Sequence, residues 1–170
     1  DRDILTIAAE RIGNEELTED TINDLNYKRN DVASAGITGV MGMGNIPIYN
    51  QMFLEQAKII RKLANYGSAV FLGRCADYIL KDIKNCTSVY LYADREFRKN
   101  RVKEIYGSNA EIMDKEEKNR ADYYNYYTGN RWGDINNYDF AINTSKVSFE
   151  EAADLIYRFA KDKQKNLKDR

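Results

Sequence analysis

The sequence contains no histidine, one proline and two cysteines, and its formal net charge is −1. The absence of histidine excludes His-dependent catalytic triads and His-ligated zinc sites, so any chemistry relies on Arg, Lys, Asp, Glu, Tyr, Ser, Thr and backbone amides. Cys75 and Cys86 match no metal-binding or disulfide spacing, and we interpret them as reduced thiols of a cytoplasmic protein. No apolar run approaches the roughly 18 residues that a membrane span needs, so a membrane is not an expected partner.

The chain is long enough for one domain with a hydrophobic core, and 43% of its 170 residues are hydrophobic while 31% are charged. We expect a single domain over residues 1–170, with a helical and loop flap over 1–49, a core and lid over 50–163, and a frayed tail over 164–170. The Gly-rich stretch at 36–44 has neither the Lys-Ser/Thr ending of a Walker A loop nor the spacing of a dinucleotide-binding fingerprint.

Hydrophobic periodicity predicts helices and short apolar runs that alternate along most of the chain. The predicted helices are 3–12, 50–65, 75–82, 95–107, 109–127 and 149–163, and the predicted strands are 68–72, 88–93 and 138–143. Asp94 is the expected N-cap of one helix, and Ser148 with Glu151 forms a capping box for the last one. The order predicts an α/β fold, a parallel sheet with helices on both faces.

Ligands of such sheets bind beyond the carboxyl ends of the strands, where Gly73-Arg74, Asp94 and Asn143-Thr144 are expected to lie. Glycine permits a tight turn there, and the planar guanidinium of Arg74 suits a phosphate. Asp77, one helical turn later, can orient Arg74 or accept a hydrogen bond from a ribose or base. The alternative is a structural Arg–Asp pair that caps the helix.

Two further segments carry candidate binding residues. Arg95, Arg98 and Arg101 recur every three residues on one helix, as a solvated basic stripe or as groups that face an anionic ligand. Residues 113–134 combine acidic and basic residues with five aromatic ones. This segment can be a helix that packs its tyrosines on the core, a lid over a polyphosphate, or a surface for single-stranded nucleic acid. The acidic residues and the near-neutral chain argue against nucleic acid.

Three blocks resemble the cytidylate-kinase-like family of P-loop nucleotide kinases: AVFLGRCADYIL, SVYLYADREFRKNRV and EKNRADYYNYYTGNRWGDINNYDFAINTS. They occur in the family's order, and the resemblance covers about residues 50–160. It implies a three-layer α/β kinase core with a helical lid. It also implies transfer of the γ-phosphoryl group of ATP, with Mg²⁺, to a nucleoside monophosphate such as CMP or to a related small acceptor.

The resemblance also implies roles for individual residues. Arg74 would bind the acceptor phosphate, Asp77 would lie near the nucleoside, and Arg101 or Arg98 would match the basic helix after a core strand. Arg120 would be the lid arginine that reaches the transferring phosphoryl group, and Glu117 the acidic lid residue. Where the family has a further lid arginine this chain has Met113, for which Lys115 or Lys118 would have to compensate.

The family's first strand and phosphate-binding loop would precede Asp1 and are not in this sequence. Without that loop the 170 residues are not expected to be an efficient kinase, and a stably folded chain would favour an upstream segment. The sequence therefore leaves three hypotheses: a nucleotide kinase, a non-catalytic nucleotide- or phosphate-binding module of the same fold, and an RNA-associated protein. It does not identify the acceptor or the oligomeric state.

Overall fold

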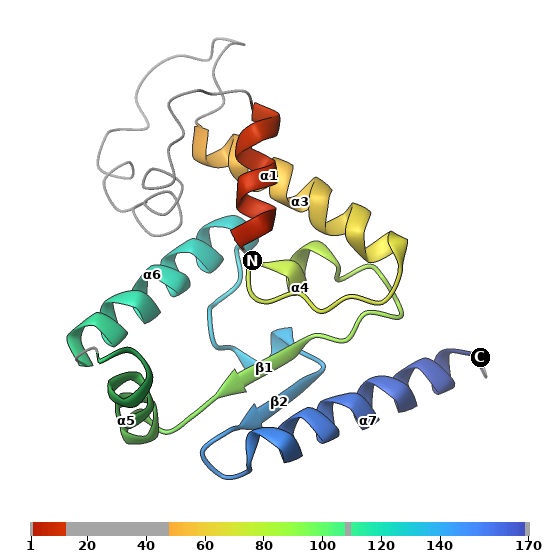
Figure 1. Ribbon diagram of the computed structural model, residues 1–170. Coiled ribbons are helices and arrows are strands. Elements are labelled where there is room, and N and C mark those ends of the chain that lie inside the picture. The colour runs from red at the N-terminus through yellow and green to blue at the C-terminus, as the bar shows by residue number, and fades with distance from the viewer. Residues whose placement is uncertain (1, 13–47, 108–109, 169–170) are drawn as a thin grey trace.

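The computed structural model describes residues 2–12, 48–107 and 110–168 (Figure 1). The Gly-rich stretch 36–44 and most of the predicted flap lie outside these residues. The elements are α1 (Arg2–Ile12), α3 (Ile48–Tyr66), α4 (Ala76–Ile79), β1 (Val89–Tyr92), α5 (Arg95–Tyr106), α6 (Ala110–Thr128), the 3-10 helix η1 (Ile135–Asn137), β2 (Phe140–Asn143) and α7 (Phe149–Lys168). None of the helices in the three described ranges combines the length and the apolar character that crossing a membrane requires.

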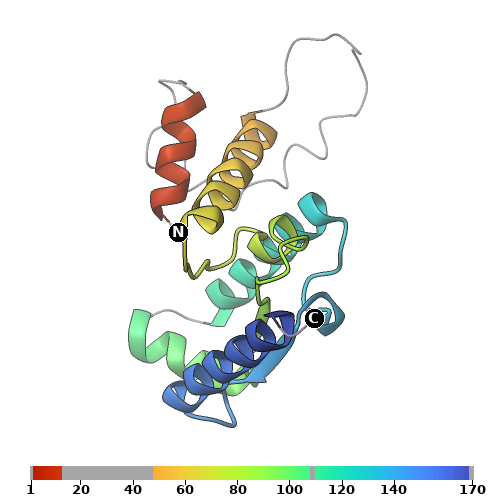
Figure 2. The same cartoon turned by 90° about the vertical axis from the view of Figure 1, so that its right-hand side faces the viewer.

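Helices α1 and α3 lie side by side above the rest of the molecule (Figures 1 and 2). Apolar residues seven and eight positions apart place Met52, Ile59 and Ile60 on the inner side of α3, where each is at least 95% buried. Met52 and Ile59 pack with Ala8 of α1, and Ile60 joins a second cluster with α4 and α6. Helix α3 therefore connects the outer helix α1 to the segment that carries Arg74 and Asp77.

Strands β1 and β2 form a parallel two-stranded sheet, in which Val89 pairs with Phe140 and Tyr92 pairs with Asn143. A parallel pair requires a crossover, which here consists of α5 and α6. Helix α7 runs along the sheet and lies in front of the strands in Figure 2. The ring of Phe159 on α7 stacks on Phe140 of β2, with centroids 4.9 Å apart.

The prediction of a buried central strand over 68–72 is wrong. This segment forms no strand, and Val70 is 90% exposed while Leu72 is 73% exposed. A short apolar run becomes a strand only where a neighbouring strand accepts and donates its backbone hydrogen bonds. Neither strand of the described residues pairs with it, so the described sheet has two strands and not the three that the sequence predicts. The mixed α/β class is compatible with the structure.

The ends of the helices show which local signals are decisive. The predicted capping box of α7 is confirmed, since Glu151 N donates to Ser148 Oγ at 3.1 Å and Ser148 N donates to Glu151 Oε2 at 2.8 Å. Asp94 is the N-cap residue of α5, as predicted, but its side chain makes no capping hydrogen bond. The Asp94 carboxylate instead accepts hydrogen bonds from Asn143 and Lys146, at 3.2 and 2.7 Å, because the carboxyl end of β2 lies beside it.

Helix α7 extends to Lys168, so residues 164–168 of the predicted frayed tail are helical. No glycine or proline interrupts this stretch. Lys163 anchors it, since its Nζ donates to the Cys86 carbonyl and to Asp139 Oδ2, both at 2.7 Å. The last turns of α7 are therefore held against the start of β1.

Candidate functional site

The turn before α4 has an unusual backbone. Gly73, Arg74 and Cys75 are three consecutive residues with positive φ, at 66°, 58° and 55°. The left-handed conformation costs a residue other than glycine about 1–2 kcal/mol, so surrounding contacts must hold Arg74 and Cys75 there. Cys75 is 4% exposed and packs in the main core cluster. Because backbone strain of this kind gathers at functional sites, the turn supports the prediction that Arg74 belongs to one.

Arg74 faces the carboxyl-terminal half of α6. Its side chain is half-buried, and its guanidinium lies beside the hydroxyl of Tyr123. The Tyr123 ring contacts Phe53 and Tyr127, with centroid separations of 6.4 and 4.7 Å. Burial raises the pKa of Tyr123 well above its usual value, and the Arg74 charge only partly offsets this effect. Tyr123 therefore stays protonated beside the cation.

Asp77 faces the next residue of the same helix. Tyr124 is 2% exposed as a whole residue. Its hydroxyl donates to Asp77 Oδ2 at 2.7 Å. Burial is the largest cause that raises the pKa of Tyr124, and the adjacent carboxylate raises it further, so this hydroxyl remains a donor. Asp77 thus bonds across to α6, and Cys75 at the N-cap of α4 makes no side-chain cap, which disfavours the helix-capping alternative.

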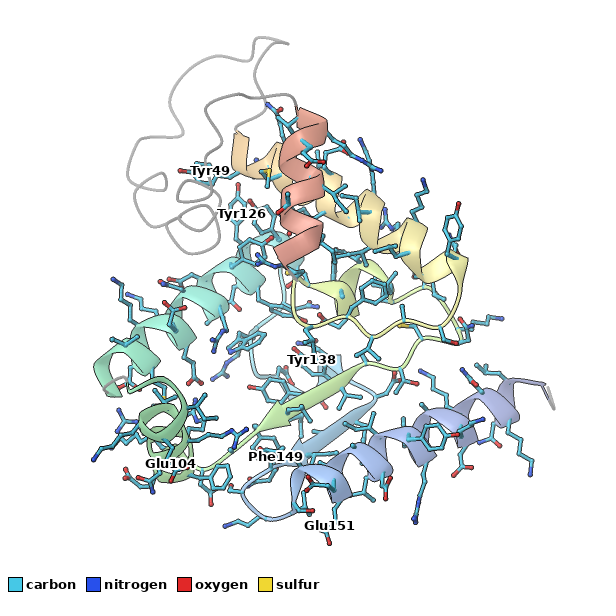
Figure 3. All side chains as sticks on the ribbon, in the orientation of Figure 1. Tyr49, Glu104, Tyr126, Tyr138, Phe149 and Glu151 are labelled. Carbon is cyan, nitrogen blue, oxygen red and sulfur yellow. The ribbon has the colours of Figure 1, made fainter. Side chains whose placement is uncertain are left out.

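Tyr124 and three other aromatic residues form a closed circuit next to Asp77. The Tyr124 ring contacts Trp132 (5.4 Å between centroids), Trp132 contacts Tyr90 (5.8 Å), and Tyr90 stacks on Tyr138 (4.9 Å). The hydroxyls of Tyr138 and Tyr124 lie near each other, so Tyr138 brings the circuit back to Tyr124. Figure 3 shows Tyr138 between the sheet and helices α4 and α6. Sequence reasoning missed Tyr90 and Tyr138, because neither strand pattern indicates which aromatic residues meet.

The basic helix α5 contacts the amino-terminal half of α6 through two ion pairs, Arg95 with Asp114 and Arg98 with Glu117. Both members of the first pair are about half exposed, while Arg98 is 34% exposed and its Nε is buried without a partner among the described residues. Tyr90 lies near the second pair. Burial raises the pKa of Tyr90, and Glu117 raises it further while Arg98 lowers it. The structure therefore brings Arg98 and Glu117 together beside the aromatic circuit.

Arg101 faces a different element. Its Cζ lies 4.2 Å from the ring centroid of Phe149, the first residue of α7, in a cation–π contact. Figure 3 shows Phe149 near the end of β1. The structure thus separates the two arginines between which the sequence could not choose, since Arg98 faces α6 and Arg101 faces α7.

The candidate lid residues lie on α6. Glu117, Arg120 and Tyr124 are three and four positions apart and share one side of the helix. Arg120, Lys115 and Lys118 are exposed. Met113, in the position of the family's further lid arginine, is 8% exposed and packs inward. Lys115 and Lys118 are therefore the exposed cations nearest to that position in the chain.

The tyrosines of α6 mostly pack inward. Tyr124 is buried, Tyr123 and Tyr127 are partly buried, and Tyr126 is 52% exposed. The rings of Tyr127 and Phe53 stack with centroids 4.1 Å apart. A surface that stacks single-stranded nucleic acid needs exposed rings, so this packing favours the structural alternative for the tyrosines.

Neither cysteine is a candidate nucleophile. Burial raises the pKa of Cys75 to about 12, so its thiol stays protonated at neutral pH. Burial also raises the pKa of Cys86. Both cysteines are free thiols.

Three acidic residues around the site each have at least one partner. Asp77 accepts from Tyr124, Asp94 from Lys146, and Glu117 pairs with Arg98. Within residues 2–12, 48–107 and 110–168, no group of three or more Cys, Asp or Glu side chains is placed to hold a metal ion. These residues therefore do not form a Mg²⁺ site on their own.

Comparisons with known proteins agree with the blocks that the sequence shows. Residues 1–146 match the cytidylate kinase-like family. A similar solved structure is that of an uncharacterized protein from Eubacterium ventriosum ATCC 27560, which is 34% identical, with a TM-score of 0.62 over 66% of this chain and 73% of that chain. The search of curated proteins found no match. Because the matched region spans most of the sequence, the chain belongs to the cytidylate kinase-like family.

Proposed function

We propose that this protein is a nucleotide kinase that transfers the γ-phosphoryl group of ATP to a nucleoside monophosphate, with CMP as the first candidate acceptor. Family membership supports a kinase-like activity. The observation that carries the proposal is the strained Gly73–Cys75 turn, which presents Arg74 and Asp77 to consecutive tyrosines of α6. A cation and a carboxylate held three positions apart match the two ends of a nucleotide, its phosphate and its nucleoside.

In this proposal Arg74 binds the acceptor phosphate, and Arg120 of the exposed lid face stabilises the charge on the transferring group. Arg98 supplies a second cation after it exchanges Glu117 for a phosphate oxygen. The cation–π contact of Arg101 with Phe149 makes it the weaker candidate for that role. Phosphoryl transfer depends mainly on positioning and charge stabilisation, and arginine forks suit both tasks.

The proposal includes the larger three-layer kinase fold and a phosphate-binding loop for ATP, which supplies the phosphoryl group when it is bound with Mg²⁺. The described residues contain no such loop. In the proposal they form the acceptor side and the lid, to which the exposed Lys115 and Lys118 add positive charge. The substrate assignment therefore needs a direct assay.

The assay is ATP consumption by the purified protein with CMP, UMP, AMP and GMP as acceptors. We expect Arg74→Ala and Arg120→Ala each to lose at least roughly 100-fold in kcat/KM, the typical effect of removing a charge-stabilising group. Arg158→Ala, an exposed arginine on α7, is the matched control and should retain activity. Circular dichroism checks that each variant folds.

Two results would contradict the proposal. Unchanged turnover in both Arg74→Ala and Arg120→Ala would remove these residues from the mechanism. A rise in melting temperature with CMP or ATP, without phosphoryl transfer for any acceptor, would instead identify a non-catalytic binding module of the same fold.

A further inference from the structure

The hydrogen bond between Tyr124 and Asp77 is unusually well enclosed. Tyr124 is 2% exposed, whereas Asp77 is partly exposed. The Tyr124 hydroxyl has a single proton, which it donates to Asp77 Oδ2 at 2.7 Å. This proton is therefore committed to the carboxylate. The result is a directed hydrogen bond from α6 to Asp77, beside the hydroxyl of Tyr138.

Ring contacts leave the Tyr124 side chain little freedom to rotate. Trp132 touches both Tyr124 and Tyr90, and Tyr90 stacks on Tyr138. Gly133 permits the close approach of Tyr90, because a Cβ at that position would lie 3.2 Å from the Tyr90 hydroxyl. The residues that hold Tyr124 thus come from β1, from the segment after α6 and from the end of η1, so the geometry is set by tertiary packing.

One oxygen of Asp77 is fixed and the other is available. Within the described part of the chain, Oδ2 accepts from Tyr124 and no hydrogen bond reaches Oδ1. A carboxylate has about four lone-pair positions, so Oδ1 keeps its capacity to accept. Arg74, three residues earlier, lies beside Tyr123, so Arg74 and Asp77 face adjacent tyrosines of α6.

We propose that Tyr124 is a positioning residue for acceptor recognition, which orients Asp77 so that Oδ1 accepts a hydrogen bond from an N–H or O–H group of the acceptor nucleoside. This inference rests on the proposed kinase function. The donor is either an amino group of the base or a hydroxyl of the sugar, because both present the same chemistry to a carboxylate. Tyr124 itself does not touch the reacting atoms.

The test compares steady-state constants of Tyr124→Phe with those of Tyr127→Phe. Tyr127 is the matched control, since it lies on the same helix and its hydroxyl bonds to the Tyr49 carbonyl at 3.1 Å, away from Asp77. We expect Tyr124→Phe to raise the KM for CMP roughly tenfold, as for loss of one hydrogen bond to a charged group, with kcat and the KM for ATP changed less than about twofold. Tyr127→Phe should leave all three constants within about twofold.

A double-mutant cycle with Asp77→Asn shows whether Tyr124 acts through the carboxylate. If it does, the double variant has the same KM for CMP as Asp77→Asn alone. Asp77→Asn by itself serves if Tyr124→Phe does not fold, and it should raise the KM for CMP at least as much as Tyr124→Phe. Comparing CMP with UMP and dCMP identifies the donor, because UMP lacks the base amino group and dCMP lacks the 2′-hydroxyl.

The outcomes separate this inference from the proposed function. An unchanged KM for CMP in Tyr124→Phe and Asp77→Asn, with activity lost in Arg74→Ala, would overturn the role of Tyr124 and leave the kinase proposal standing. A KM effect in Tyr124→Phe that multiplies with that of Asp77→Asn would also overturn it. If no nucleoside monophosphate is phosphorylated or bound, the kinase proposal fails and this inference fails with it.

Discussion

The two halves of α6 make contacts of different kinds. Its carboxyl-terminal half packs Tyr123 and Tyr124 against the 73–77 segment, in an aromatic environment from which water is largely excluded. Its amino-terminal half contacts α5 through the Arg95–Asp114 and Arg98–Glu117 pairs, whose side chains are 34–52% exposed. Buried contacts of mixed aromatic and hydrogen-bonded character hold a fixed geometry, whereas exposed ion pairs exchange partners readily.

This contrast fits the proposed function, in which one half of α6 contacts the acceptor site and the other half belongs to the lid. In the proposed function, the carboxyl-terminal half of α6 holds Arg74 and Asp77 in a fixed arrangement for the acceptor. Its amino-terminal half is held by ion pairs that a phosphate can displace, because a phosphate oxygen can replace a carboxylate as the partner of an arginine. The following predictions test the contrast, from the largest expected effect to the smallest.

Trp132→Ala should be the most destabilising of these changes. Trp132 contacts both Tyr124 and Tyr90, and its loss opens a cavity inside the aromatic circuit. Because the ring is only partly buried, we expect a loss of about 2–3 kcal/mol in the free energy of unfolding, somewhat below the range for fully buried aromatic residues. Chemical denaturation measures it, and a loss below about 1 kcal/mol would mean that the circuit does not hold the site.

Gly133→Ala should cost about 1–2 kcal/mol, because φ at this position is +78° and the new Cβ would lie 3.2 Å from the Tyr90 hydroxyl. Combining it with Tyr90→Phe separates the two causes. Removing the hydroxyl relieves the crowding and leaves the cost of the backbone conformation. If the double variant unfolds at the same denaturant concentration as Gly133→Ala alone, crowding against the Tyr90 hydroxyl contributes nothing to the loss.

Lys163→Met should have an intermediate effect of about 1 kcal/mol, since Lys163 bonds to the Cys86 carbonyl and to Asp139. The Lys163 and Asp139 side chains are 27% and 34% exposed. This ion pair is therefore less exposed than the Arg95–Asp114 pair and more exposed than the Tyr124–Asp77 contact. Substitution by methionine keeps the apolar part of the side chain.

The same variant should change the acid sensitivity of the protein. Burial raises the pKa of Asp139, but hydrogen bonds from Lys163 and Ser88 outweigh it, and the net pKa lies below its usual value. Such a group stabilises the fold above its unfolded pKa, and this contribution is lost as the pH falls through the folded pKa. Between about pH 5 and about pH 3, the melting temperature of Lys163→Met should therefore fall less steeply than that of the parent protein. Equal slopes would remove Asp139 from the acid response.

Arg95→Ala should change the free energy of unfolding by less than about 0.5 kcal/mol, as expected for an exposed ion pair. The measurement is chemical denaturation at low and at high salt, with Arg158→Ala as the control. A loss above about 1 kcal/mol would show that the lid end is held as firmly as the acceptor end, and the contrast between the halves of α6 would disappear.

Local sequence patterns predicted most of the regular elements. Helices α3, α5, α6 and α7 and strands β1 and β2 lie within a few residues of their predicted bounds, apart from the longer end of α7. The capping box of Ser148 and Glu151 was also predictable, because all of its atoms lie within four consecutive residues. These features depend on interactions between residues that are close in the chain.

The predictions that failed depend on neighbours that the sequence does not place. Whether 68–72 is a strand depends on an adjacent strand, and whether the Asp94 side chain bonds to α5 depends on the competing donors of Asn143 and Lys146. Arg98 and Arg101 look equivalent in the sequence, yet one faces Glu117 and the other Phe149. Competition between distant partners decided each case.

The sequence by itself determined the family, the helical faces and the Gly73-Arg74-Asp77 motif, because these depend on residue type and short-range spacing. Tertiary structure alone decided that Asp77 meets Tyr124, 47 residues away, and that Tyr90 and Tyr138 support this contact. The physical reason is that a hydrogen bond or ring contact needs its partners within a few ångströms. Only the packing of α4, α6 and the two strands brings these partners together.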